Sequence, residues 1–115
     1  MNIETYIKNG YRVLRIEGDV TINTDISPLK KAIDDCLEKG ELKFGILFPS
    51  TTYLFSRSIG TLVQCYEMIS STGGTLAIIK PNQNILDLLN VLGDCYFNNQ
   101  IQVCESEEEL GEALD

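Results

Sequence analysis

Two serines and an arginine, Ser56-Arg57-Ser58, are the residues of this 115-residue chain best suited to chemistry. They stand between residues 43–48, an apolar run typical of a buried strand, and a stretch with the apolar spacing of a helix. A hydroxyl at a helix start can accept a phosphoryl group, and a neighbouring guanidinium can pair with the phosphate. The same hydroxyls could instead cap the helix by accepting backbone N–H groups. The residues alone leave both interpretations open.

Composition excludes most other routes to catalysis. The chain has no histidine, which removes Ser–His and Cys–His catalysis and the usual zinc ligand sets. Gly73-Gly74 precedes a predicted strand rather than a helix, so it is not a phosphate-binding loop. A carboxylate-based enzyme stays a distant alternative, because no spacing pairs the aspartates Asp25, Asp34, Asp35, Asp87 and Asp94. The sequence therefore predicts no enzyme, no metal site and no cofactor.

The charge of the chain narrows the class of partner. Nine lysines and arginines stand against seventeen aspartates and glutamates, a net charge of −8. Nucleic-acid and anionic membrane surfaces require clustered cations, so neither is an expected partner, and a protein with a basic face is favoured. No apolar run approaches the ~20 residues of a membrane span. The N-terminus lacks the layout of a signal peptide, so a cytoplasmic location is expected.

The hydrophobic pattern predicts one small α/β domain over residues 1–115, with a mixed, mostly parallel sheet and flanking helices. The element order is ββαβαβαβα. The expected strands are 2–7, 11–17, 43–48, 75–79 and 100–104. The expected helices begin at Ser27, Ser58, Asn82 and Ser106, and the first three end at Gly40, Gly73 and Gly93. The strand 43–48 is expected at or near the centre of the sheet.

Local motifs support these boundaries. Asn9-Gly10 between two strand-like segments is the strongest short signal for a hairpin. Ser27 before proline is expected to be the N-cap of the first helix, and Ser106 with Glu109 has the spacing of a capping box.

The expected core includes two leucines and most of the cysteines. Leu62 and Leu89 fall on the apolar faces of the second and third helices, so both should be buried. Three of the four cysteines lie within apolar patterns, and no pair has CxxC spacing, which favours reduced core thiols.

The chain resembles a STAS domain, the fold of bacterial anti-sigma factor antagonists and stressosome scaffold proteins. The resemblance covers nearly the whole chain through the order of its elements. It is strongest in 58-SIGTLVQCYEMISSTGGTLAIIKPNQNILDLLNVLG-93, with its Gly-x-Leu helix start, its Gly-Gly strand entry and its leucine-rich third helix.

In STAS domains the turn before the second helix carries Asp-Ser-Ser/Thr-Gly, whose second hydroxyl accepts phosphate from a partner kinase. An ungapped alignment places Phe55 at the aspartate, Ser56 at the first hydroxyl, Arg57 at the phosphoacceptor and Ser58 at the glycine. The run 46-ILFPS-50 also lacks the acid or amide that the family often carries there. The phosphorylation motif is therefore degenerate.

The resemblance implies a non-catalytic protein-interaction module in bacterial signalling, whose partner would be an anti-sigma factor kinase or another STAS protein. A small-ligand sensor that binds a nucleotide or another anion near Ser56 and Asn82 is the alternative. We expect recognition at the degenerate motif, with phosphorylation absent or secondary. The candidate docking or phosphorylation residues are Ser56, Arg57 and Ser58, and the candidate partner surface adds Asn23, Thr24, Asp25 and Phe55.

Overall fold

The chain begins with a β-hairpin in the computed structural model, which describes residues 2–21, 23–97 and 100–111. Strands β1 (Asn2–Lys8) and β2 (Tyr11–Glu17) pair antiparallel. The turn between them places Asn9 at φ 54° and Gly10 at φ 82°. Asparagine and glycine are the residues that tolerate positive φ at both central positions, so the predicted hairpin is confirmed.

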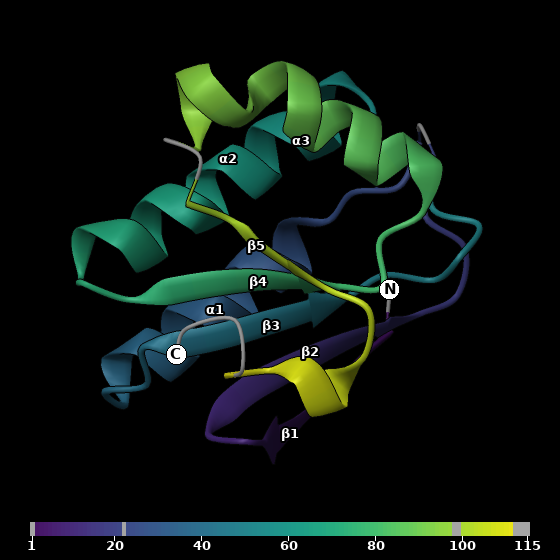
Figure 1. Ribbon diagram of the computed structural model, residues 1–115. Coiled ribbons are helices and arrows are strands. Elements are labelled where there is room, and N and C mark those ends of the chain that lie inside the picture. The colour runs from purple at the N-terminus through teal and green to yellow at the C-terminus, as the bar shows by residue number, and fades with distance from the viewer. Residues whose placement is uncertain (1, 22, 98–99, 112–115) are drawn as a thin grey trace.

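Five strands form one sheet in the order β1-β2-β3-β4-β5 (Figure 1). Strands β3 (Lys43–Leu47), β4 (Thr75–Ile79) and β5 (Gln102–Cys104) continue parallel to β2. The predicted mixed sheet and its central strand are confirmed, because β3 is the middle strand. Side chains of β3 contribute to an apolar layer on each face of the sheet, which explains the nearly unbroken apolar run in the sequence.

The helices α1 (Ser27–Glu38), α2 (Ser56–Ser71) and α3 (Gln83–Tyr96) contribute to one apolar layer on one face of the sheet. Leu29, Leu62 and Ile85 from the three helices belong to the same cluster as Phe44 and Ile46 of β3. The helix faces that build this layer are those that the 3.6-residue pattern predicted.

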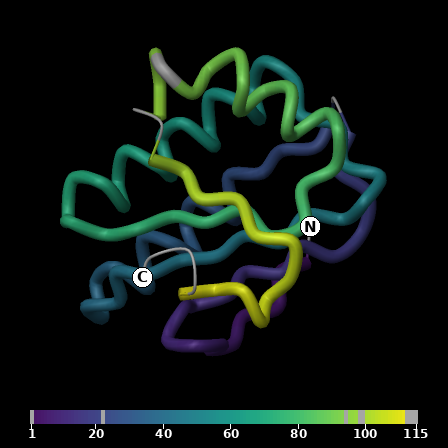
Figure 2. The backbone as a smooth tube through the Cα atoms, in the orientation of Figure 1, coloured from purple at the N-terminus to yellow at the C-terminus, as the bar shows by residue number. Residues whose placement is uncertain are grey.

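The opposite face of the sheet is covered by the segment that follows β5. Its single 3₁₀ turn, η1 (Glu107–Glu109), brings Leu110 onto Val13 and Ala77 of the sheet. The backbone trace shows this C-terminal segment crossing the sheet from β5 towards the hairpin (Figure 2). The side-chain amide of Asn9 donates to the carbonyl oxygens of Glu108 at 3.1 Å and Leu110 at 3.2 Å. The hairpin turn therefore holds the C-terminal segment in place.

Two predicted features of the helix starts differ from the structure. Ser27 is the first residue of α1 rather than its cap; the N-cap is Ile26, and the Asp25 carboxylate accepts the Ser27 N–H at 2.9 Å. The capping box at Ser106 is wrong, because only a 3₁₀ turn follows and the serine side chain makes no cap bond. The rest of the predicted last helix, residues 112–115, lies outside the described residues.

Helix α3 also runs past its predicted end. Gly93 is buried inside the helix, which continues to Tyr96, so the prediction that this glycine stops the helix is wrong. Gly73 does end α2, since its φ of +83° is a conformation that side chains disfavour. Leu62 is buried, as predicted, but Leu89 is only partly buried, because it lies at the edge of the helical layer.

Three of the four cysteines lie in the core, as predicted: Cys36, Cys65 and Cys104 are buried, and Cys95 is exposed. Burial raises the pKa of the Cys65 thiol to about 12, so this side chain stays protonated and behaves as a small apolar group. Among the helices in the described part of the chain, none is both long and apolar enough to traverse a bilayer.

Candidate functional site

Three loops meet at one end of the sheet because the parallel strands that precede them end there. These are the segments after β2, β3 and β4. The carboxyl ends of parallel strands share one edge of a sheet, which brings segments distant in sequence together. The Tyr53 N–H donates to the Val20 carbonyl at 2.8 Å, and the Thr51 hydroxyl donates to the Asp19 carboxylate at 3.0 Å. The first two loops are thus tied together directly.

Two asparagines of the third loop and α3 hold the loop that leads into α2. The Asn82 side-chain amide donates to the carbonyls of Ser50 at 2.9 Å and Thr52 at 2.7 Å. Its oxygen accepts the Ile85 N–H, which makes Asn82 the N-cap of α3. Asn84 accepts the Leu54 N–H at 2.9 Å. Asn82 was predicted as the start of the third helix and as a candidate ligand residue, and its role in holding the loop, like that of Asn84, was not predicted.

The two serines of the degenerate motif occupy different environments. Helix α2 begins at Ser56, and its N-cap, Phe55, has no side-chain cap bond. Ser58 is buried inside the first turn, with its hydroxyl 3.4 Å from the Thr24 carbonyl that accepts it. Both cap interpretations are therefore wrong. The helix starts two residues earlier than predicted, so the serines lie within its first turn rather than before it.

Arg57 is exposed beside Asp25, which joins two members of the predicted surface. The pKa of the Asp25 carboxyl is lowered first by the hydrogen bond from the Ser27 backbone N–H, and Arg57 lowers it further. Thr24 also lies beside the first turn of α2, because its carbonyl accepts the hydrogen bond from Ser58. The Thr24 hydroxyl accepts the Thr21 N–H at 2.9 Å.

The remaining predicted residues lie on loops. Asn23 is exposed in the turn after β2, where its N–H donates to the Thr21 hydroxyl at 3.3 Å. Phe55 is 53% exposed, and its ring stacks with that of Tyr53, which is 50% exposed, at a centroid distance of 6.4 Å. Sequence analysis missed Tyr53, although an aromatic residue two positions before Phe55 is a signal for an adjacent ring on the same side of an extended segment.

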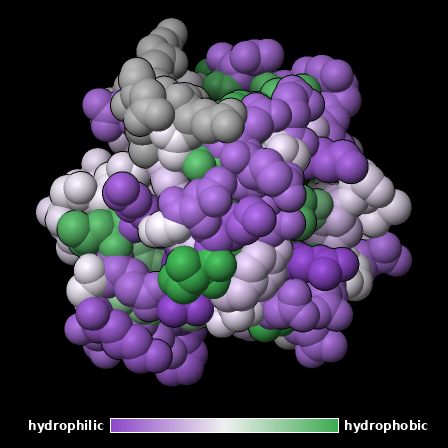
Figure 3. Space-filling model, turned by 60° about the horizontal axis from the view of Figure 1, so that its bottom comes forward, coloured by the Kyte–Doolittle hydropathy of each residue, from purple (hydrophilic) through white to green (hydrophobic). Residues whose placement is uncertain are grey.

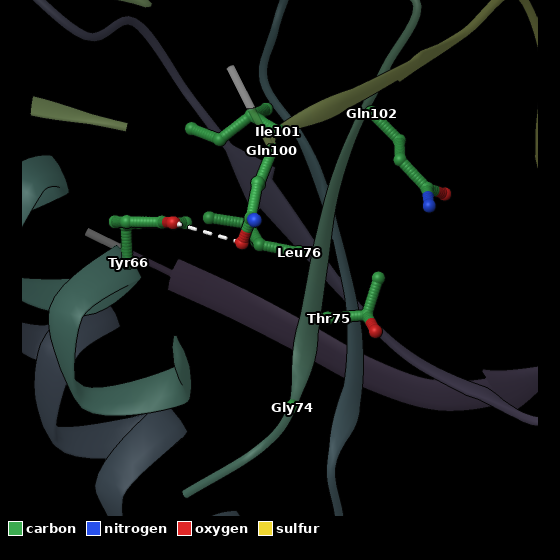
Figure 4. A pocket seen from close by; sticks show the side chains of 7 residues that line it. All are labelled: Tyr66, Gly74, Thr75, Leu76, Gln100, Ile101 and Gln102. Atoms are coloured by element: carbon green, nitrogen blue, oxygen red, sulfur yellow. Dashed lines mark hydrogen bonds between the residues drawn. The ribbon is translucent and has the colours of Figure 1, made fainter. Parts of the chain in front are cut away.

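Depressions in the surface lie at this edge of the sheet and beyond it. One of about 600 Å³ lies along the ends of β2, β3 and β4 and is flanked by the cations Arg15 and Lys80. Another, of about 320 Å³, lies at the opposite end of β4, where Figure 4 shows the Tyr66 hydroxyl directed at the Gln100 amide, 3.4 Å away. That second depression is lined by hydroxyls, amides and apolar groups, a set that does not supply a carboxylate or an amine for acid–base work.

The surface chemistry also limits where a partner can bind. The side of the molecule that comes forward in Figure 3, from the bottom of Figure 1, is mostly hydrophilic, with hydrophobic residues in small separate areas. Within the described residues, no group of three or more acids and cysteines could hold a metal ion. The stacked rings of Tyr53 and Phe55 are half exposed and directly precede the start of α2, which carries Arg57.

The chain is similar in sequence to a candidate anti-sigma factor antagonist. No family model matches the chain. A candidate anti-sigma factor antagonist of Thermotoga neapolitana, the homologue of TM1081, is 26% identical over 86 residues, 75% of this chain and 71% of that protein.

Solved structures agree. The crystal structure of TM1081 of Thermotoga maritima, itself a candidate anti-sigma factor antagonist, matches with a TM-score of 0.77 and 22% identity over 96% of this chain and 92% of that one. The Bacillus cell fate determinant SpoIIAA in its phosphorylated form matches with a TM-score of 0.67 and 11% identity over 97% and 99%. The chain is a STAS-like domain that resembles anti-sigma factor antagonists in sequence and in fold.

Proposed function

We propose that this protein is a non-catalytic interaction module of bacterial signalling that acts as anti-sigma factor antagonists do, by binding a regulatory protein. The proposed partner is an anti-sigma factor kinase or another STAS protein. The proposed place of action is the cytoplasm. Its support is the likeness to the candidate antagonists and to SpoIIAA. No group of side chains described above has the arrangement of an acid–base or nucleophilic site.

The observation that carries the proposal is the exposed group formed by Tyr53, Phe55 and Arg57 at the start of α2. Tyrosine and arginine are enriched among residues that dominate binding energy. The loop beneath them is held by Asn82 and Asn84, so little order has to be gained on binding. A rigid base with exposed rings and a cation suits recognition.

Phosphorylation is secondary in this proposal. Ser58 is only 2% exposed, so a kinase would have to unfold the helix start to reach its hydroxyl. Arg57 occupies the acceptor position of the family motif and cannot accept a phosphoryl group in the same way. Ser56 is exposed at the first position of α2 and is the remaining hydroxyl that a kinase could reach. Intact-mass measurement of protein purified from its native host should show no major species heavier by about 80 Da.

Affinity capture from native lysate, with identification by mass spectrometry, tests the proposal. The recovered partner is then purified and titrated against the wild type, Arg57→Ala and Phe55→Ala. Both variants should bind at least about tenfold more weakly, the effect of about 1.4 kcal/mol. Both should keep the wild-type melting temperature, since exposed side chains contribute little to stability. Arg15→Ala, a change at another exposed arginine, is the matched control. Equal binding by all variants would contradict the assignment of this surface.

A further inference from the structure

Helix α2 contains a glycine for which the described part of the chain offers no packing reason. Gly60 lies in the second turn of the helix, is exposed, and a Cβ placed there would meet nothing within 4 Å. Glycine is less favourable than alanine inside a helix, because it loses more backbone freedom on folding. No neighbouring group within the described fold requires a residue without a side chain at this position. Close approach by another molecule would explain why glycine stands there.

Three cations lie on the same pair of packed helices as this glycine. Lys30 and Lys31 belong to α1 and Arg57 to α2. The Lys30 ammonium reaches across to α2 and donates to the Gln64 side-chain carbonyl at 3.1 Å. In the part of the chain that the structure describes, the ion pairs involve other residues: Arg12 with Glu41 and Arg15 with Glu4. Among the described residues, none of the three cations forms a close salt bridge, although Arg57 interacts electrostatically with Asp25.

These cations lie near the starts of the helices that carry them. Arg57 lies in the first turn of α2, where the helix dipole disfavours positive charge, and Lys30 and Lys31 lie in the first half of α1. The first turns of α1 and α2 contain no acidic residue, although the chain has seventeen aspartates and glutamates. The acids beside the cluster are Asp25, which accepts the Ser27 N–H, and Asp34, which lines a depression of about 300 Å³ with Lys30 and Lys31.

We propose that an acidic segment of the protein partner crosses the α1–α2 surface defined by Lys30, Lys31, Arg57 and Gly60, with its backbone close to Gly60 and its carboxylates on the three cations. This inference rests on the proposed function and specifies the chemistry of the partner. It reverses the expectation from net charge, which favoured a partner with a basic face. A local cluster of cations in a chain of net charge −8 orients an acidic segment, because the surrounding negative charge repels it from other surfaces.

A titration followed by amide NMR signals tests the charge of the surface with a defined probe. Deca-glutamate should shift the signals of Lys30, Lys31 and Gly60, and raising the salt concentration should abolish the effect, because exposed charges are screened. Deca-lysine of the same length is the control and should leave these signals unchanged. The proposal is overturned if deca-glutamate leaves the α1–α2 surface unaffected, or if deca-lysine shifts it more.

Variants test the same surface with the purified partner from the capture experiment. Lys30→Glu with Lys31→Glu should weaken binding at least tenfold, while the control, Lys8→Glu with Lys39→Glu, makes the same change of net charge at the hairpin and the far end of α1. Gly60→Ala should weaken binding at least fivefold without lowering the melting temperature.

The possible outcomes separate the two proposals. If the wild type recovers no partner, the proposed function fails and this inference fails with it. If a partner is recovered and Arg57→Ala weakens its binding, but the lysine reversal and Gly60→Ala bind as the wild type does, the proposed function stands and the acidic segment is overturned.

Discussion

At the residue scale, Ser56 and Ser58 differ more than their shared side chain suggests. Ser56 is exposed at the first position of α2, whereas Ser58 is buried and its hydroxyl donates to the Thr24 carbonyl. Their positions in the STAS motif do not reveal this difference. The contact with a loop from another part of the chain does, and it makes Ser58 a structural residue that joins α2 to the segment after β2.

The first prediction compares these serines. Ser58→Ala should lower the free energy of unfolding by about 0.5–1.5 kcal/mol, because the Thr24 carbonyl loses its donor. Ser56→Ala should change it by less than about 0.5 kcal/mol, since the exposed hydroxyl caps nothing. Urea unfolding measures both. A larger loss for Ser56→Ala than for Ser58→Ala would restore the cap interpretation that the structure contradicts.

A glutamate at each position gives a second prediction. Ser56→Glu should raise the free energy of unfolding by about 0.3–1 kcal/mol, because a negative charge at the first position of a helix favours the dipole. Ser58→Glu should lower it by more than about 2 kcal/mol, because the fold has to bury an unpaired carboxylate or open the loop. Thermal unfolding of the two variants distinguishes these signs. If both variants are as stable as the wild type, the Ser58 side chain is accessible to solvent and the buried position described above is contradicted.

At the element scale, the position of the loop from β3 to α2 depends on hydrogen bonds to Asn82 and Asn84, which follow their partners by 30 to 32 residues. Asn82 serves two elements at once: its oxygen caps α3, and its amide donates to the carbonyls of Ser50 and Thr52. A loop of backbone carbonyls needs such donors to stay near the core. The N-terminal end of α2 is therefore positioned from α3, and changes at Asn82 should be felt at Arg57.

The third prediction follows from these bonds. Asn82→Ala should lower the free energy of unfolding by about 2–4 kcal/mol, the sum of a lost cap and two lost hydrogen bonds. Asn82→Asp keeps an oxygen for the cap but loses the donors, so its loss should be smaller. Gln83→Ala is the neighbouring control, because among the described residues its exposed side chain bonds only Asp87 of the same helix. An Asn82→Ala variant as stable as this control would show that the loop is held by other contacts.

At the scale of the whole molecule, the C-terminal segment closes the second face of the sheet. Leu110 covers residues of β2 and β4, and the Tyr6 hydroxyl donates to the Glu107 carboxylate. Burial, followed by this hydrogen bond, raises the pKa of Tyr6 to about 12 from its usual 10.0. The first and last described elements of the chain are thereby joined across the sheet.

The fourth prediction is a pH dependence at this contact. A folded-state pKa above the unfolded value means that the contribution of Tyr6 is complete below about pH 10 and is lost as the pH rises towards 12. Other groups titrate in the same range, so the measured quantity is the difference between wild type and Tyr6→Phe. The stability advantage of the wild type should shrink between pH 10 and 12. Glu107→Gln should likewise reduce the difference in free energy of unfolding between proteins with Tyr6 and with Tyr6→Phe. If the difference between wild type and Tyr6→Phe stays constant across that pH range, the contact is contradicted.

Sequence by itself determined the order of the five strands and the first three helices, because the signals that define them are local. Asn9-Gly10 specifies a hairpin through its own backbone preferences, and the apolar run of β3 predicts a strand buried on both faces whatever follows it. The resemblance to STAS domains rests on the same order of elements and was confirmed by the comparisons.

Tertiary structure alone decided which residues of the motif face the solvent and where the charges gather. Helix α2 starts at Ser56 because Asn84 and Thr24, both remote in sequence, hold the loop before it and the serine after it. The residue Asp25, just before α1, lies beside Arg57 because parallel strands place both helix starts at one end of the sheet. Such contacts depend on packing between distant segments, and no local pattern of residue types encodes them.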